Sequence, residues 1–167
     1  MSTYSIWLIP SGEVYKKFAE IIENFSNKYL APKFEPHLTL IGGWQGNKKE
    51  AISKTKKLAS LLFPFSTAAR GIGYTENIHK ALFINCDNNK RLANAHLIAK
   101  RIFNHKEEKY LPHISLIYGK FNKKEKSRMI KSLKKYPKLL KFNSICLFDV
   151  ENNDEGKWFK TSEFKIK

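Results

Sequence analysis

The chain has 167 residues, of which 42% are hydrophobic and 13% aromatic, a composition that is typical of a folded globular protein and excludes a disordered one. This length predicts one compact domain with a sizeable core, and the longest apolar runs are too short to cross a bilayer. Because nothing near the start resembles a signal peptide, we expect a cytoplasmic protein that has no membrane partner.

The formal charge is +16, and its excess is lysine, since the chain has only four arginines. Such a field gathers phosphate-bearing molecules, from nucleotides to RNA, but it is also typical of solvated lysine-rich helix faces. Arginine is the preferred side chain for bidentate contacts with phosphates and base edges, and its scarcity disfavours dedicated nucleic-acid binding. The charge therefore fits an anionic substrate, a nucleotide or cyclic phosphate, and leaves RNA open.

Strand and helix patterns alternate along the first half of the chain. The opening run "TYSIWLIP" is rich in β-branched and aromatic residues and stops at a proline, while the next segment spaces its apolar residues as a helix does. The elements expected here are strand 3–10, helix 13–30, strand 37–43 closed by glycines, helix 48–63 and strand 65–75.

The second half repeats this order. The elements expected there are strand 80–87, helix 89–103, strand 113–119, helix 123–136, strand 140–150 and strand 157–167. Equivalent residues lie 76 or 77 positions apart, as His113 from His37 and Ala81 from Tyr4. This regularity predicts two βαβ-like lobes, approximately 1–78 and 79–167, related by a pseudo-two-fold axis. Neither lobe is expected to stand alone, so we expect a single bilobal domain over residues 1–167, with strand exchange between the lobes.

The repeat contains a small polar motif twice, as "PHLTL" around His37 and Thr39 and as "PHISL" around His113 and Ser115. Roughly one half of one H-x-[ST] match is expected by chance, so two matches alone carry little weight. However, in both copies a proline precedes the histidine, apolar residues flank the hydroxyl and a glycine ends the strand. The motif therefore differs from the surroundings of the other three histidines, although a structural origin for both copies stays possible on sequence alone.

The geometry of a strand gives these residues a chemical role. Residues i and i+2 point to the same face, so His37 projects with Thr39 and His113 with Ser115. If the lobes face each other, two imidazoles and two hydroxyls meet in one cleft. Imidazoles can act as base and acid on opposite sides of an in-line displacement at phosphorus, and hydroxyls can donate to the non-bridging oxygens. No step requires a metal or cofactor, and no carboxylate lies at ligand spacing from either histidine.

At these residues the chain resembles the 2H phosphoesterase superfamily and, through "YSIWLIP", "PKFEPHLTL" and "PHISLIYG", its plant and yeast cyclic phosphodiesterases. The resemblance implies an α+β, two-lobed fold in which antiparallel sheets face a central cleft with helices packed outside. It also implies an enzyme, a metal-independent cyclic phosphodiesterase. This enzyme would hydrolyse 2',3'-cyclic nucleotides or ADP-ribose 1'',2''-cyclic phosphate to a phosphomonoester by two-histidine acid/base catalysis.

The same resemblance assigns three aromatic residues to substrate binding: Trp7, Phe83 and Tyr118. The first two are also 76 residues apart, and a matched pair of rings could hold a base or ribose between the lobes. Plain core packing is the alternative for each of them. Tyr118 is out of phase with the His113 face of its strand unless the strand twists or ends there.

Three alternatives remain at this stage: an RNA-end or 2',5'-oligoadenylate phosphodiesterase of the same superfamily, a non-catalytic RNA-binding module, and, with least support, a metal-dependent hydrolase. A pure binding module would not need both histidines.

The two cysteines, Cys86 and Cys146, form neither a CxxC motif nor a zinc cluster, and we expect them to be buried free thiols. We expect a monomer.

Overall fold

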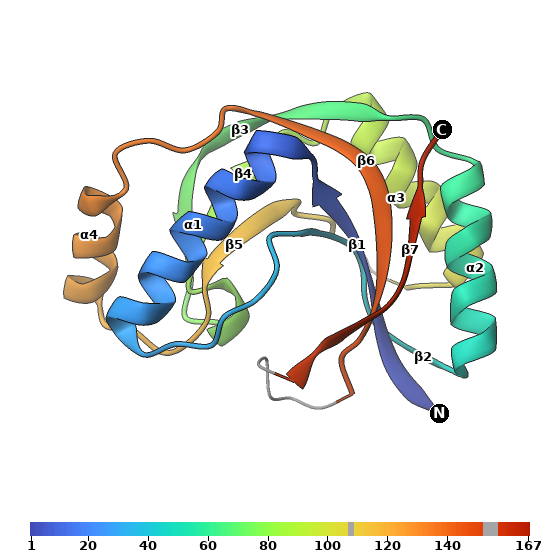
Figure 1. Cartoon of the computed structure of the whole chain (residues 1–167), viewed down its shortest axis with the longest axis horizontal. Coiled ribbons are helices and arrows are strands. Elements are labelled where there is room, and N and C mark those ends of the chain that lie inside the picture. Colours follow the sequence, from blue (N-terminus) through green and yellow to red (C-terminus); the bar gives the residue numbers. More distant parts are fainter. Residues whose placement is uncertain (107–108, 152–156) are drawn as a thin grey trace.

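The computed structural model describes residues 1–106, 109–151 and 157–167 (Figure 1). Its helices and strands form an α+β fold, as the sequence predicts. Over these residues the elements in chain order are β1 (Ser2–Pro10), α1 (Gly12–Tyr29), β2 (Leu38–Gly46), α2 (Lys48–Ser60), β3 (Phe65–Tyr74), the short 3-10 helix η1 (Ile78–Lys80), β4 (Leu82–Cys86), α3 (Lys90–Phe103), β5 (His113–Ile117), α4 (Lys123–Ser132), β6 (Leu139–Asp149) and β7 (Phe159–Lys165).

Several boundaries differ from the expected ones for local reasons. The prediction that glycines close the second strand was wrong, because β2 continues through them to Gly46. Gly43 adopts a φ of 67°, and the register shift beside it forms a bulge that lets the strand go on pairing with β1. The fourth helix ends at Ser132 and not at residue 136, because Leu133 leaves helical geometry with a ψ of 77°, while Pro137 disfavours helical backbone at Tyr136.

The strands form one antiparallel sheet in the order β1-β2-β5-β4-β3-β6-β7, and the end strand β1 also pairs with β6, the neighbour of the other end strand. The long strand β6 makes this possible because its residues 139–142 pair with β3, whereas residues 142–149 pair with β1 and residues 144–149 with β7. At the centre, β2 and β5 pair through Leu38 and Ile114, which are 76 residues apart. The two motif strands therefore meet at this one register pair, where the site residues lie, while β1 with β6 and β3 with β4 and β6 join the halves elsewhere.

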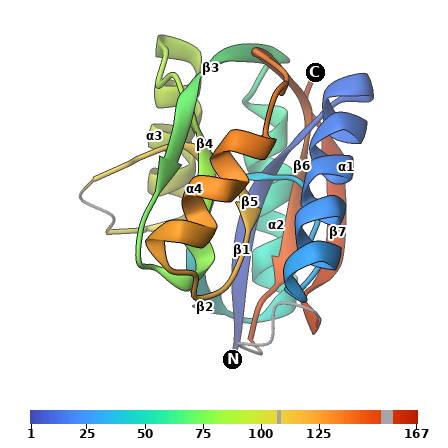
Figure 2. The ribbon, with the colours of Figure 1, turned by 90° about the vertical axis from the view of Figure 1, so that its left-hand side faces the viewer.

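The helices pack outside the sheet. The first helix of each half contacts the motif strand of the other half, so that α1 packs on β5 and α3 on β2. Figure 1 places α1 and α4 at one end of the long axis and α2 and α3 at the other, and Figure 2 shows the helices around the strands from the α4 side. None of the described helices is long and apolar enough to span a bilayer.

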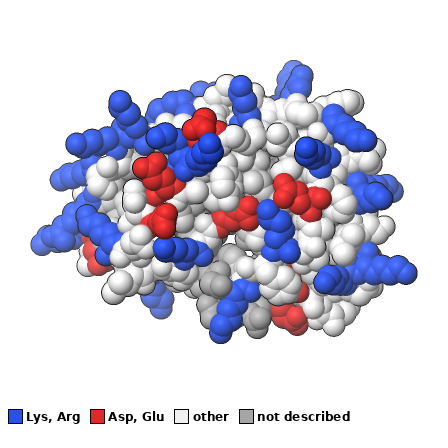
Figure 3. Space-filling model, viewed as in Figure 1, with Lys and Arg blue, Asp and Glu red and all other residues white. Residues whose placement is uncertain are grey.

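Charged side chains are dispersed over the face shown in Figure 3. Lys and Arg side chains lie around its rim and also nearer its middle, with acidic side chains among them, and do not form one continuous stripe. The cysteines Cys86 and Cys146 are free and buried, as expected, and burial raises the pKa of both thiols to about 12. They therefore act as small apolar side chains and not as nucleophiles.

Candidate active site

The two motif strands place the four polar residues on one surface. Leu38 pairs with Ile114 in an antiparallel register, and continuing it by one residue each way sets His37 opposite Ser115 and Thr39 opposite His113. Because side chains alternate along a strand, all four point to the same face of the sheet. The structure thus brings together the four residues that the sequence singles out, and all four line one cleft of about 530 Å³.

His37 is the more enclosed of the two imidazoles, with 7% of its surface exposed. Its Nδ1–H donates to the Glu35 carbonyl oxygen at 2.6 Å, so the neutral ring keeps a lone pair on Nε2. The Trp7 ring stacks on it with centroids 3.6 Å apart. Burial lowers the pKa of His37 to about 3, against the opposing hydrogen bond to Glu35 and with a small contribution from His113. The His37 ring is therefore neutral near pH 7, and its Nε2 is able to accept a proton.

His113 repeats this arrangement in a more open setting. Its Nδ1–H donates to the Leu111 carbonyl oxygen at 2.9 Å, so its Nε2 is also directed away from the backbone. The ring is half-buried. Burial lowers the pKa of His113 as well, the hydrogen bond to Leu111 opposes this, and the charge of Lys80 lowers it further. The two carbonyl partners, Glu35 and Leu111, are themselves 76 residues apart, so the duplication extends to the tautomer of each histidine.

The two hydroxyls differ in their hydrogen bonds. The Ser115 Oγ donates to the His79 carbonyl oxygen at 2.8 Å. Within the described residues, the Thr39 hydroxyl has no hydrogen-bond partner, and only its backbone carbonyl accepts, from Tyr110 at 3.0 Å. A hydroxyl has a single proton to donate, so the Thr39 proton is available to a ligand, whereas Ser115 must first give up its bond to the His79 carbonyl.

The three aromatic residues lie around the histidines in different ways. Trp7 is 3% exposed, and its two faces are covered by His37 and by Phe148, whose centroid lies 4.0 Å away. Phe83 is opposite Ser115 on β4 and turns its ring at 65° to His113, with centroids 5.3 Å apart. It contacts the His113 ring and is absent from the described cleft lining. In these positions neither ring offers a free face for stacking on a base.

Tyr118 comes immediately after β5 ends at Ile117, which removes the objection from strand alternation. Its hydroxyl lies 3.5 Å from the His37 Nε2, and its ring stacks on Phe34 with centroids 3.8 Å apart. Tyr118 also lines the cleft, so it is the one of the three whose polar end faces the space between the histidines.

Sequence reasoning missed several residues of the cleft. Trp158 contacts the rings of Trp7, Tyr118 and His79. The further lining residues that carry or can carry positive charge are His79, Lys80, His105 and Lys109. Among the described residues, none of those lining the cleft is acidic. The motif search passed over His79 and His105 because neither has a hydroxyl two positions later, and a lone lysine in a lysine-rich chain gives no signal.

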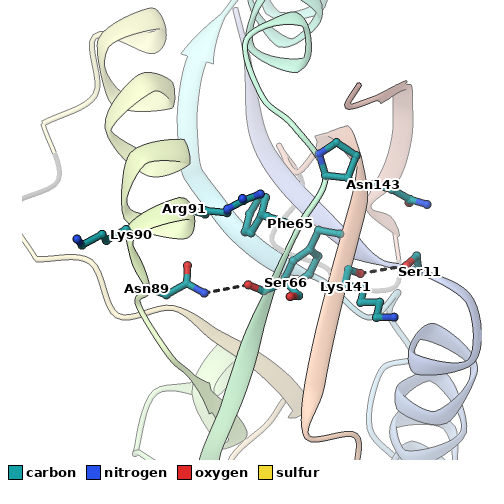
Figure 4. A pocket seen from close by; sticks show the side chains of 10 residues that line it. Ser11, Phe65, Ser66, Asn89, Lys90, Arg91, Lys141 and Asn143 are labelled. Atoms are coloured by element: carbon teal, nitrogen blue, oxygen red, sulfur yellow. Dashed lines mark hydrogen bonds between the residues drawn. The ribbon is translucent and has the colours of Figure 1, made fainter.

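A larger hollow of about 830 Å³ lies where β1, β3, β6 and the start of α3 meet (Figure 4). Its polar groups already bond to the protein: Ser11 Oγ donates to the Lys141 carbonyl at 3.2 Å, and Asn89 Nδ2 to the Ser66 carbonyl at 2.8 Å. Its cations do not converge, since Lys90 points away from Lys141. No histidine or cysteine lines it in the described chain, so it lacks groups for acid/base chemistry at neutral pH.

In the parts of the chain that the structure describes, no three His, Cys, Asp or Glu side chains are grouped to hold a metal ion. The metal independence expected from the sequence stays a prediction that an experiment must test.

The fold and the duplicated histidine motif are those of the 2H phosphoesterases. The resemblance found in the sequence implies that enzymes of this class work without a metal. Comparison with known families agrees: the model of the 2'-5' RNA ligase superfamily matches residues 12–154, and the chain belongs to this superfamily. A relative, the cyclic phosphodiesterase of Arabidopsis thaliana, is 23% identical over 124 residues, which are 74% of this chain and 68% of that protein.

Two solved structures have the same fold over nearly their whole length. E. coli LigT in complex with 3'-AMP has a TM-score of 0.61 and 11% identity, covering 99% of this chain and 98% of that chain. TT0787 of Thermus thermophilus has a TM-score of 0.65 and 17% identity, covering 98% of this chain and 97% of that chain. These likenesses confirm the predicted fold class.

Proposed function

We propose that this phosphoesterase is a cyclic phosphodiesterase, which opens 2',3'-cyclic nucleotides or ADP-ribose 1'',2''-cyclic phosphate to a phosphomonoester. The observation that carries the proposal is the matched pair of imidazoles. Each ring has its Nδ1 held by a backbone carbonyl two residues upstream, so that each Nε2 is free of the backbone in one shared cleft, where the Tyr118 hydroxyl lies 3.5 Å from the His37 Nε2. The Arabidopsis relative, named a cyclic phosphodiesterase, supports the same type of substrate.

The burial of the two histidines suggests how the proton transfers are divided. His37 is neutral and enclosed, so its Nε2 accepts a proton from the attacking water. His113, more exposed and with the less lowered pKa of the pair, carries a proton on Nε2 and gives it to the departing sugar oxygen. The new bond joins the water oxygen to phosphorus, the bond to the sugar oxygen breaks, and the product is a phosphomonoester. The Thr39 hydroxyl donates to a non-bridging oxygen, on which negative charge increases.

The deciding experiment is hydrolysis of a panel of 2',3'-cyclic nucleotides and of ADP-ribose cyclic phosphate, followed by phosphorus NMR to assign the product. The expected result is turnover of at least one cyclic phosphate that persists after prolonged dialysis against EDTA. Activity that EDTA abolishes and a divalent ion restores would contradict the metal-free mechanism. Absence of turnover on the entire panel would contradict the function.

A second candidate, hydrolysis at cyclic RNA ends or 2',5' linkages, is favoured by the positive charge of the cleft lining and of the whole chain. E. coli LigT has been crystallised with ATP and with NADP+ as well as with 3'-AMP, which shows that a protein of this fold accommodates nucleotides of different sizes. Comparing kcat/KM for a cyclic mononucleotide with that for an oligonucleotide ending in a 2',3'-cyclic phosphate separates the two. A preference of 100-fold or more for the oligonucleotide would favour RNA.

A further inference from the structure

The two motifs differ in their hydroxyls, because Ser115 already donates to the His79 carbonyl, whereas the Thr39 hydroxyl has no partner among the described residues. The residue after His79 is a lysine that lines the cleft. We propose that Lys80 is a catalytic residue that binds a non-bridging oxygen of the reacting phosphate and supplies electrostatic stabilisation in the half of the cleft where the Ser115 proton is already engaged. This inference rests on the proposed function, and it adds to it a residue outside the duplicated motif.

The segment that carries Lys80 is held rigidly. The Lys80 carbonyl accepts from Thr75 Oγ1 at 2.6 Å and from Thr75 N–H at 3.1 Å, and its own N–H donates to the Asn77 carbonyl at 3.0 Å. At η1, Gly119 N–H donates to the Ile78 carbonyl at 2.8 Å, beside the Ser115 bond to His79. The backbone at Lys80 is therefore fixed directly to the end of the second motif strand.

A buried lysine on α4, Lys126, binds the residues that precede η1. Lys126 of α4 is 3% exposed, and its Nζ donates to the Thr75 carbonyl at 2.9 Å and pairs with Glu76 at 3.0 Å. Burying a lysine is costly unless its hydrogen bonds are satisfied, and here they are satisfied by the loop that carries Lys80. Such preorganisation is expected of a group that must meet developing charge without rearranging.

The side chain of Lys80 lies beside the reacting centre. Its Nζ is 5.4 Å from the centroid of the Phe83 ring, which in turn contacts His113. Its charge acts on His113 strongly enough to lower the pKa of that imidazole. Among the described residues Lys80 forms no ion pair, so its charge is not neutralised by a carboxylate. A half-buried lysine without an acidic partner, in a cleft without acidic lining residues, is suited to a phosphate oxygen.

The first motif has no equivalent cation. The residue 76 positions before Lys80 is Tyr4, a core side chain with 2% exposure. The free hydroxyl thus belongs to one copy, at Thr39, and the free cation to the other, at Lys80. Together they would contact the phosphate from both halves of the cleft.

The test compares Lys80→Gln and Lys80→Arg with Lys57→Gln, which removes the same charge from an exposed position on α2, outside the sheet. For Lys80→Gln the expected loss in kcat/KM is about 100-fold, as for a lost oxyanion donor, with Lys80→Arg recovering at least a tenth of the wild-type value. Titration with inorganic phosphate, followed by phosphorus NMR, should show at least tenfold weaker binding in Lys80→Gln. The limb of the pH profile that belongs to His113 should move to higher pH, because a charge that lowers its pKa is gone.

Each result bears on the inference. Loss of activity and phosphate binding in Lys80→Gln, with Lys57→Gln close to wild type, supports it. If wild-type protein hydrolyses cyclic phosphates and Lys80→Gln stays within threefold in both measurements, Lys80 is not catalytic. If wild-type protein hydrolyses no cyclic phosphate yet binds inorganic phosphate through Lys80, the proposed function fails while the anion site stands. Wild-type protein that neither hydrolyses nor binds phosphate at millimolar concentrations would overturn both.

Discussion

The His37 and His113 regions share a backbone plan and differ in what surrounds it. In both, the histidine Nδ1 donates to a carbonyl two residues earlier, and the hydroxyl residue pairs across strands with an aromatic residue, Thr39 with Trp7 and Ser115 with Phe83. In the first region the imidazole is buried and stacked. In the second it is half-buried and contacts a ring at an angle.

This difference shows how a duplicated scaffold can support an asymmetric reaction. A displacement at phosphorus needs one proton acceptor and one proton donor, so two identical imidazoles would be in the wrong state for one of the two tasks. Burial disfavours the charged form of the histidine that is more enclosed, and in the proposed reaction this would make His37 the acceptor. The backbone plan gives both rings the same tautomer, and the local packing makes their pKa values differ.

The largest expected effect comes from removing either imidazole. His37→Ala and His113→Ala should each lower kcat/KM by about 10² to 10⁴, and the double variant should lose much less than the product of the two losses. A substrate whose leaving group needs no proton, such as a p-nitrophenyl phosphodiester, sharpens the comparison. On that substrate His113→Ala should recover most of its lost rate, whereas His37→Ala should not.

The opposite pattern, recovery by His37→Ala alone, would reverse the assignment of base and acid. Near-normal turnover of every cyclic phosphate by both single variants would mean that the duplicated motif is structural, and the non-catalytic RNA-binding alternative would then return.

The hydroxyls should respond unequally, although the motif makes them look alike. Thr39→Val removes a donor that has no protein partner among the described residues and should lower kcat by about 10² to 10³ with little loss of stability. Ser115→Ala breaks a buried hydrogen bond to the His79 carbonyl and should cost about 1 to 3 kcal/mol of unfolding free energy. Urea unfolding and steady-state kinetics on both variants measure this. Equal kinetic losses with equal stability would show that Ser115 also donates to the substrate.

The sequence predicted the order of the elements and the four motif residues because both depend on local signals. Alternating apolar residues and helical spacing are local, and an H-x-[ST] pair on a strand needs only the two-residue period to put His37 and Thr39 on one face. The 76-residue offset is also the separation of Leu38 and Ile114, which pair between the two motif strands, although the offset alone did not predict that pairing. The course of β2 beyond Gly43 was missed because a glycine in a bulge and a glycine that ends a strand look the same in sequence.

What the sequence could not give is the surroundings of each motif. The matched pair Trp7 and Phe83 suggested two equivalent stacking rings, but Phe148 on a distant strand covers one face of Trp7 while His37 covers the other. The Ser115 bond depends on a 3-10 helix at 78–80 that no periodicity marks. Trp158 reaches the cleft only because β7 pairs with β6. These contacts join segments far apart in the chain, and local patterns do not encode them.

The dependence of rate on pH tests the difference in burial directly. If His37 must be neutral, kcat/KM falls as the pH drops below its lowered pKa, about 3. If His113 must be charged, the rate falls about tenfold per pH unit once the pH exceeds its own lowered pKa, which lies below 6.5. The optimum of kcat/KM should therefore lie on the acid side of neutrality, with both limbs belonging to the coupled pair. An optimum above pH 7.5 would contradict this division.

The smallest expected effect concerns the two aromatic rings that contact the histidines, Trp7 and Phe83. Trp7 lies parallel to His37, at 11° and 3.6 Å, whereas Phe83 meets His113 at 65° and 5.3 Å. An aromatic pair contributes about 0.5 to 1.5 kcal/mol beyond its buried area, which corresponds to about 2- to 12-fold in rate if all of it orients the base. Trp7→Leu should lower kcat by close to the upper value with KM unchanged, and Phe83→Leu should lower kcat by close to the lower value.

Because stacking also keeps water away from His37, Trp7→Leu should raise the pKa of the acidic limb, while Phe83→Leu should leave it in place. A large rise in KM for Trp7→Leu would instead show that its ring binds the substrate, as the resemblance to plant and yeast enzymes implies.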